Sequence, residues 1–306
     1  MTDASKSELP TPLTVGVIGF GIMGQGIAHV FGVSGHKVIV MARSRESYEA
    51  RLVNFERSVS KSLSRSEIDM TAEDMLSRLS YADKYADFRG ADLVIEAVSE
   101  DDIEKAAVLG KLCEALDDKT IIATNTSSFS ITQLAACTDR PGKFIGIHFM
   151  NPAHIMPLVE IVRGLTTDES TLDTVTEWVE GLGKTVVTPA DSPGFILNRI
   201  LIPMINEAIY CLHEGGGSVE SIDKTLKGAA NHPMGPLELA DLIGLDTCLA
   251  IMQKLHSGMS DPKYRPCPLL IRYVEAGWLG RKTKKGFYDY KAPGRPATWP
   301  LSVKSS

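Results

Sequence analysis

LTVGVIGFGIMG at residues 13–24 joins a short apolar run to a glycine-rich turn, and a helical pattern follows it directly. A strand, a G-x-G-x-x-G turn and a helix in this order form the loop that holds a dinucleotide pyrophosphate. The first glycine permits the tight turn, the second lets the backbone approach the phosphates, and the third lets helix and strand pack closely. The helix N-terminus adds free N–H groups. The predicted phosphate site is Gly19, Gly21, Ile22, Met23 and Gly24; a glycine turn without a ligand is the less favoured alternative.

Further apolar runs alternate with helical segments along the first half of the chain. These runs are nearly continuous, as expected for strands that are buried on both faces. They are Leu13–Gly19, Lys37–Met41, Leu93–Ala97, Ile121–Thr124 and Phe144–His148, with two more strand candidates at Val159–Val162 and Thr185–Thr188. Amphipathic segments such as Ile103–Leu116 lie between them. The pattern predicts an α/β fold, a Rossmann-type doubly wound and mostly parallel sheet.

The pattern changes at Asp191-Ser192-Pro193-Gly194, which breaks secondary structure. Helical periodicity follows at Ile196–Glu214, Ser218–Lys227, Pro236–Leu255 and Pro268–Ala276. We therefore expect a disordered leader at 1–12, a dinucleotide-binding domain at 13–190 and an all-helical domain at 191–306. Apolar helices such as Ile200–Tyr210 favour a homodimer formed through the second domain; internal packing of these helices is the alternative.

Bulk properties exclude several classes of protein. A formal charge of −6 argues against nucleic-acid binding, which requires a basic surface. The five cysteines form no CxxC pair, so neither a disulfide framework nor a metal site is expected, and a reducing compartment is favoured. No secretory leader is visible, and no apolar run reaches the ~20 residues that span a bilayer. We expect a cytoplasmic protein with no membrane partner.

The end of the second predicted strand bears on the choice of cofactor. NAD-selective sites place an acid there to bind the ribose 2′-hydroxyl. Here the chain reads Ala42-Arg43-Ser44-Arg45, and the first acid is Glu46. Two guanidinium groups and a hydroxyl suit a 2′-phosphate, so Arg43, Ser44 and Arg45 predict NADP, with NAD as the alternative. The two arginines could instead be solvated loop charges.

A histidine and a glutamate form the candidate acid–base pair. His148 ends an apolar strand, at the edge where open α/β sheets bind ligands. Glu160 lies inside the apolar run Leu158–Val162, where an unpaired carboxylate would be costly. A pair between them would remove that cost and would fix the imidazole for proton transfer. From spacing alone, a purely structural histidine is almost as well supported.

Seven motifs in a fixed order carry a resemblance that spans roughly residues 13 to 290. They are Gly19–Ala28, Asn125–Ser128, His148–Pro152, Leu158–Val162, Ser192–Arg199 (SPGFILNR), Asn231–Pro236 and Gly286–Tyr290. In these motifs the sequence resembles the 3-hydroxyacyl-CoA dehydrogenase family, and most of all its bacterial stand-alone members. The resemblance implies a Rossmann domain, a helical domain and a substrate cleft between the two.

The resemblance also assigns roles to single residues. It implies that His148 is the general acid/base, that Glu160 orients it, and that Ser127 and Asn198 bind the substrate near it. On the nicotinamide side of the cofactor it implies Glu100, Lys105 and Asn151, with Lys282 as a further candidate, and on the CoA side Ser58 and Arg65. Several have a structural alternative. Ser127 could cap the helix near Ile131, together with Ser128, and Asn198 could cap a helix or brace the domain junction. Ser58 and Arg65 could belong to a solvated helical face, and Lys282 to a solvated tail.

Two departures from the family pattern stand out. The usual acid after the second strand is Ala42, and a lysine that many members have after Met156 is replaced by Pro157. The expected activity is hydride transfer between NADP(H), or NAD(H), and C3 of a short 3-hydroxyacyl-CoA such as 3-hydroxybutyryl-CoA. Two other functions stay open: a dehydrogenase of a free 3-hydroxy acid, and a non-catalytic dinucleotide-binding protein.

Overall fold

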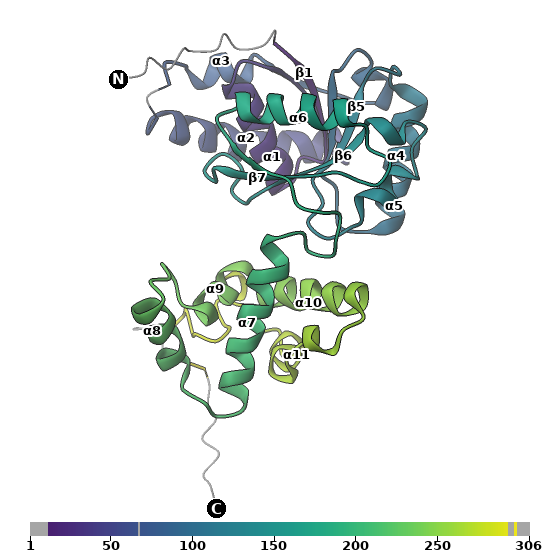
Figure 1. Ribbon diagram of the computed structural model, residues 1–306. Coiled ribbons are helices and arrows are strands. Elements are labelled where there is room, and N and C mark those ends of the chain that lie inside the picture. Colours follow the sequence, from purple (N-terminus) through teal and green to yellow (C-terminus); the bar gives the residue numbers. More distant parts are fainter. Residues whose placement is uncertain (1–11, 67, 293–296, 299–306) are drawn as a thin grey trace, which may run out of the picture. The chain divides into compact units, whose positions relative to one another are not determined.

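The computed structural model describes residues 12–66, 68–292, 297 and 298 (Figure 1). Its contacts divide the chain into two compact units, Met1–Ser192 and Pro193–Ser306. The leader predicted at 1–12 lies outside the described residues, except for Pro12. Among the helices of the described residues, none is both long enough and apolar enough to cross a membrane.

The first unit is built on an eight-stranded sheet with the order β3-β2-β1-β4-β5-β6-β7-β8. Its strands are β1 (Thr14–Ile18), β2 (Lys37–Met41), β3 (Leu79–Tyr81), β4 (Leu93–Glu96), β5 (Ile121–Thr124), β6 (Phe144–Phe149), β7 (Leu158–Val162) and β8 (Thr185–Val187). All neighbours are parallel except β6 and β7, which are antiparallel. The predicted mostly parallel, Rossmann-type sheet is confirmed. The sequence pattern missed β3, because three residues, two of them half-buried and one exposed, give too short a signal.

Helices cover both faces of this sheet. They are α1 (Ile22–Val33), α2 (Arg45–Leu63), α3 (Ala72–Leu76), α4 (Asp102–Ala115), α5 (Ile131–Ala135) and α6 (Glu169–Gly181), with short 3-10 helices at Tyr85–Phe88 and Pro141–Lys143. In Figure 1, α4 and α5 lie on the opposite side of the strands from α1 and α2. One buried apolar cluster joins α1, α2 and α6 to the strands, through side chains such as Phe31, Phe55 and Val175. This double covering explains why the strands are apolar on both faces.

The glycine turn between β1 and α1 leaves no space for a side chain at its first and third glycines. Gly19 has a φ of +102°, and a Cβ there would lie 2.5 Å from the Ala97 carbonyl oxygen. At Gly24 a Cβ would lie 1.8 Å from the Gly19 carbonyl oxygen. The turn also lies where the strand order reverses, between β1 and β4, and ligands of open α/β sheets bind at such points.

The second unit is helical and has its own core. Its elements are α7 (Leu197–His213), α8 (Val219–Ala229), α9 (Pro236–Ile243), α10 (Leu245–Met259) and α11 (Pro268–Glu275), with 3-10 helices at Pro262–Tyr264 and Arg281–Thr283. The prediction of one helix over Pro236–Leu255 was wrong. Gly244, with a φ of +104°, separates α9 from α10, because that backbone conformation cannot continue a right-handed helix.

A buried carboxylate anchors the Gly286–Tyr290 segment to the helical unit. Asp241 of α9 is fully buried and accepts hydrogen bonds from the Phe287 N–H (2.9 Å), the Tyr288 N–H (3.0 Å) and the Tyr290 hydroxyl (3.1 Å). A Cβ on Gly286 would lie 1.9 Å from Asp241 Oδ1, which explains the glycine. Burial raises the pKa of Asp241 to about 6, although these donors partly oppose the shift. The motif at 286–290 therefore has a structural task in this unit.

Candidate active site

The predicted site residues of the first unit gather at the edge of the sheet where the parallel strands have their carboxyl ends. The glycine turn follows β1, Glu100 lies just beyond β4, Ser127 follows β5, and His148 lies near the end of β6. Loops at this edge of an α/β sheet bind ligands, because short strand-to-helix connections expose backbone and side-chain groups there.

The antiparallel pairing of β6 and β7 forms the His–Glu pair. His148 and Glu160 are directly opposite in the register of the two strands. His148 Nδ1 lies 2.7 Å from Glu160 Oε2, and the two residues are 8% and 1% exposed. A buried carboxylate at this distance holds a hydrogen on Nδ1, so Nε2 is the nitrogen that can exchange a proton. The arrangement suits general acid/base chemistry.

Asn125 fixes the end of the histidine strand. Its Oδ1 accepts a hydrogen bond of 2.9 Å from the Phe149 N–H, next to His148. Asn151 follows in the connection to β7, exposed and joined to Pro152 by a cis peptide bond. The connection is held by Lys184, whose Nζ donates to the carbonyl oxygens of Ala153 (2.8 Å) and Met156 (2.9 Å).

A network of charges follows β4 and β5 at the same edge of the sheet, and one of its residues, the buried Glu96, was missed in the sequence. Lys105 is 1% exposed and donates to both carboxylate oxygens of Glu96 at 2.9 Å. Its Nζ also lies 3.7 Å from Glu100 Oε2. Glu100 in turn accepts hydrogen bonds from Thr126 Oγ1 (3.0 and 2.8 Å) and from the Ser127 N–H (3.0 Å). Glu100 thus contacts both Lys105 and Ser127 and links the two residues.

Ser127 does not cap the following helix. Ser130 is the N-cap of α5, and its hydroxyl accepts a hydrogen bond from the Gln133 N–H (3.2 Å). Asp191 accepts from the N–H groups of Ile131 (2.9 Å) and Thr132 (2.8 Å), which completes the cap. The capping alternative for Ser127 was therefore wrong, because Ser130 and Asp191 already bind these N–H groups.

Arg43, Ser44 and Arg45, predicted to bind a 2′-phosphate, follow β2 directly. Their side chains have partners within the chain. Ser44 caps α2 by accepting from the Ser47 N–H at 3.1 Å. The guanidinium of Arg43 lies 3.3 Å from Ser99 Oγ and 3.8 Å from Glu104, and its side chain is 79% exposed. Arg45 pairs with Asp83 at 3.1 Å and lies over the Tyr81 ring. Exposed ion pairs of this kind are weak, so both arginines can turn toward a ligand.

The remaining predicted residues lie in other places. Ser58 is exposed on α2, and Arg65 is exposed just beyond its C-terminus. Asn198 is buried in the first turn of α7, and Lys282 forms an ion pair with Asp246 within the helical unit. Their predicted roles toward substrate or cofactor stay predictions. Among the residues that the structure describes, no three His, Cys, Asp or Glu side chains are grouped as a metal site would require.

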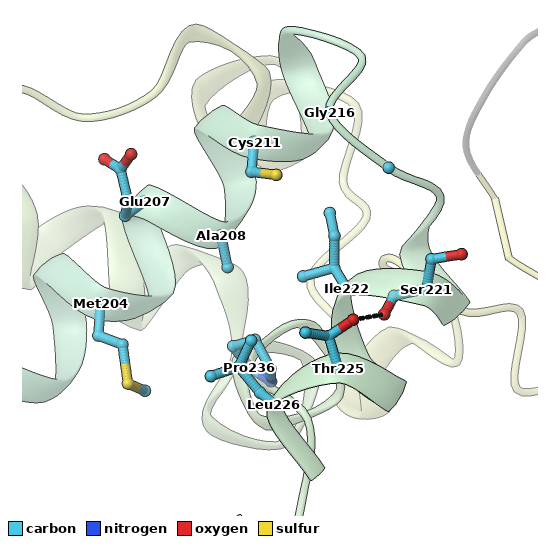
Figure 2. Close-up of a pocket in the computed structure, with 11 residues that line it drawn as sticks. Met204, Glu207, Ala208, Cys211, Gly216, Ser221, Ile222, Thr225, Leu226 and Pro236 are labelled. Atoms are coloured by element: carbon cyan, nitrogen blue, oxygen red, sulfur yellow. Dashed lines mark hydrogen bonds between the residues drawn. The ribbon is translucent and has the colours of Figure 1, made fainter. Parts of the chain in front are cut away.

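A cavity of about 480 Å³ lies in the helical unit, and all the residues that line it belong to that unit. Figure 2 shows that Met204, Ala208 and Cys211 of α7 face Ile222 and Leu226 of α8 across it. Its lining is mainly apolar, with Glu207 as the one charged residue. The residues that line it include no histidine–carboxylate pair like that of His148 and Glu160.

Comparisons with known proteins agree over nearly the whole chain. Residues 14–192 match a family model described as 3-hydroxyacyl-CoA dehydrogenase, NAD binding domain, and residues 194–290 match the C-terminal domain of the same family. A 3-hydroxybutyryl-CoA dehydrogenase of Bradyrhizobium diazoefficiens is 53% identical, over 90% of this chain and 95% of its own length. The crystal structure of (S)-3-hydroxybutyryl-CoA dehydrogenase from Ralstonia eutropha has a TM-score of 0.87 and 43% identity, covering 92% of this chain and 99% of that one. A diketoreductase that acts on dicarbonyl compounds has a TM-score of 0.80 and 30% identity, covering 92% of this chain and all of its own.

We predict that Glu160→Gln lowers kcat at least about tenfold, because a neutral amide stabilises the imidazolium less and can bind the wrong tautomer. Steady-state reduction of acetoacetyl-CoA measures the change. Glu169→Gln on the exposed start of α6 is the matched control and should leave kcat unchanged. A Glu160→Gln enzyme with normal kcat would show that the carboxylate has no part in proton transfer.

Proposed function

The chain belongs to the 3-hydroxyacyl-CoA dehydrogenase family, and we propose that it interconverts a short 3-hydroxyacyl-CoA and its 3-ketoacyl-CoA. It is an oxidoreductase with a nicotinamide-dinucleotide-binding domain. The observation that carries the proposal is the buried His148–Glu160 pair at 2.7 Å, at the same sheet edge as the glycine turn. An acid–base group and a dinucleotide loop at one edge are what oxidation of a secondary alcohol requires.

The residues of the turn fit a dinucleotide. The space that a Cβ would fill at Gly19 and Gly24 is already taken by backbone, so the tight turn at the N-terminus of α1 requires glycine at both positions. Gly19, Gly21, Ile22, Met23 and Gly24 would hold the pyrophosphate. A bound nicotinamide would accept the hydride from C3 or supply it.

In this proposal His148 takes the proton of the C3 hydroxyl on Nε2, and it returns that proton in the reductive direction. Glu160 stabilises the imidazolium that forms. Ser127 hydrogen-bonds the substrate oxygen, and Asn198 is proposed to assist it. Pre-aligned donors at an oxygen that gains negative charge stabilise the transition state more than the ground state.

For the cofactor we propose NADP(H), with NAD(H) as the alternative. Ala42 replaces the acid that would bind a ribose 2′-hydroxyl. Arg43 and Arg45 follow it with exposed side chains, and their ion pairs with Glu104 and Asp83 lie at the surface, so both are available to a 2′-phosphate. Reduction of a 3-ketoacyl-CoA with NADPH fits this choice.

Regarding the substrate, a four-carbon acyl group is proposed, in line with the names of the relatives. Ser58 and Arg65 are proposed to contact the phosphates of CoA, because they are exposed on and just beyond one helix, α2. The five thiols form no disulfide, which suits work in the cytoplasm.

We also propose a homodimer formed through the helical unit. Ile200, Met204, Ala208 and Cys211 form one stripe along α7, and Ile200 is 66% exposed. The stripe continues into the apolar cavity of Figure 2. An apolar surface of this kind on a helix is a common site of protein association, and a second copy offers the same stripe in return.

We predict that His148→Gln lowers kcat at least about 100-fold for acetoacetyl-CoA, since a positioned acid–base group contributes that much or more. Loss of absorbance at the nicotinamide band measures the rate. Turnover within tenfold of the wild type contradicts the assignment. Free acetoacetate, assayed in parallel, tests the alternative: activity on it, with none on the thioester, would identify a free-acid dehydrogenase instead.

We predict that Ala42→Asp shifts the ratio of kcat/KM for NADPH over NADH at least about tenfold toward NADH, because the new carboxylate repels a 2′-phosphate and accepts from a 2′-hydroxyl. Ala42→Asn, which adds no charge, should shift the ratio less. A wild-type enzyme that already prefers NADH strongly would overturn the NADP proposal.

We predict that Ala208→Arg makes the protein monomeric, because a guanidinium in the apolar stripe would be desolvated in the dimer. Sedimentation equilibrium should give twice the chain mass for the wild type and the single mass for the variant. Gln253→Arg, on an exposed position of α10, should stay dimeric. A monomeric wild type would disprove the dimer.

A further inference from the structure

One carboxylate next to the proposed cofactor site has an unusual number of donors. Glu96 is the last residue of β4, in the sheet interior, and is fully buried. It accepts from Lys105 Nζ (2.9 Å to each oxygen), from Thr124 Oγ1 (2.7 Å) and from the Val98 N–H (2.7 Å). A buried charge costs several kcal/mol unless it is paired and hydrogen-bonded, and here both conditions are met.

The donors of Glu96 come from three places around the strand-order reversal. Thr124 ends β5, Lys105 lies on α4, and Val98 begins the segment that leads to Glu100. That segment packs on the glycine turn: a Cβ on Gly19 would lie 2.5 Å from the Ala97 oxygen and 3.3 Å from the Val98 nitrogen. Glu96 therefore fixes the backbone that borders the predicted dinucleotide crevice.

Glu96 also determines what Lys105 does. The ammonium lies between two carboxylates, 2.9 Å from Glu96 and 3.7 Å from Glu100. The nearer carboxylate holds it, so Glu100 is left to accept from Thr126 Oγ1 and from the Ser127 N–H. A charge-assisted hydrogen bond to Glu96 is stronger than the longer contact to Glu100, and it sets the division.

We propose that Glu96 is a positioning residue for the reaction: by holding Lys105 and the Val98 N–H, it leaves the Glu100 carboxylate to orient Ser127 and the nicotinamide half of the cofactor. The inference rests on the proposed function, in which Glu100 and Ser127 border the reacting groups. Glu96 itself is buried beneath the crevice and acts through Glu100.

Replacing the carboxylate predicts a specific rearrangement. With Glu96→Gln the side chain keeps its size but loses its charge, so Lys105 must pair with Glu100, its one remaining carboxylate in this network. Glu100 then moves toward Lys105 and away from Ser127. When Glu100→Gln is also present, residue 100 carries no charge, so Lys105 no longer draws it away from Ser127.

The test is a double-mutant cycle of Glu96→Gln and Glu100→Gln, read by three measurements. The fluorescence of the reduced cofactor gives its dissociation constant Kd. Steady-state turnover of acetoacetyl-CoA gives kcat, and thermal unfolding gives Tm. We expect Glu96→Gln to raise Kd and lower kcat about tenfold in the wild-type background, and less than about threefold in the Glu100→Gln background. Tm should fall by a similar amount in both backgrounds. Glu114→Gln, on the exposed face of α4, is the control.

Each result decides the question. Equal changes of Kd and kcat in both backgrounds, or a lower Tm with unchanged Kd and kcat, would show that Glu96 is only structural. If Glu96→Gln fails to fold, Thr124→Val is used instead. It removes one donor to Glu96 (2.7 Å) together with the longer contact from the Thr126 N–H (3.3 Å), and it should give the same background-dependent effect at smaller size. The absence of that effect overturns the proposal. A wild-type enzyme that binds cofactor but does not reduce acetoacetyl-CoA would refute the proposed function. The double-mutant cycle measured by cofactor Kd would still test the role of Glu96.

Discussion

The hydrogen bond between His148 and Glu160 is the interaction on which the proposed chemistry depends. It exists because one strand of the sheet runs against the others. A parallel β7 would need a long crossover from β6, and the two residues, twelve apart, could not be directly opposite each other. The reversed strand lets the chain turn back within a short connection. It thereby places a carboxylate beside the imidazole in the interior. The hydrogen bond between them offsets the free-energy cost of burying both groups.

Much of the fold follows from the sequence, and the misses have physical causes. Buried strands and the glycine turn leave continuous apolar runs and a fixed spacing, so the Rossmann-type sheet was predictable. The end of α9 was not predictable, because the helical pattern of apolar residues continues through Gly244. Only the backbone conformation of Gly244 shows the break. At the site, the apolar run that pointed to Glu160 has an equivalent in Leu93–Ala97. The same argument, applied there, would have found Glu96 and its need for a cation. Contacts such as those of Arg43 and Lys282 depend on tertiary packing, which no local pattern records.

Three buried acids illustrate how the donors around a carboxylate decide its use. Glu160 has the imidazole of His148, the group that exchanges a proton in the proposed reaction. Glu96 has the ammonium of Lys105 at 2.9 Å, which holds its position in the network. Asp241 in the helical unit has backbone N–H groups and a phenol hydroxyl, with no cation among these donors, and burial raises its pKa to about 6. All three residues are carboxylic acids, and their surroundings decide what each one does. Glu160 is proposed to support proton transfer, Glu96 is proposed to position Glu100, and Asp241 anchors a backbone segment.

The connection between β6 and β7 is tied down independently of the acid–base pair. Lys184 binds its carbonyl oxygens, and Asn125 fixes the strand end before it. Because strand register, and not this connection, keeps His148 opposite Glu160, side chains such as Ile155 and Pro157 can change without disturbing proton transfer. Sequence changes are therefore tolerated best in this connection, where residues can vary while the register of β6 and β7 keeps the His148–Glu160 hydrogen bond intact.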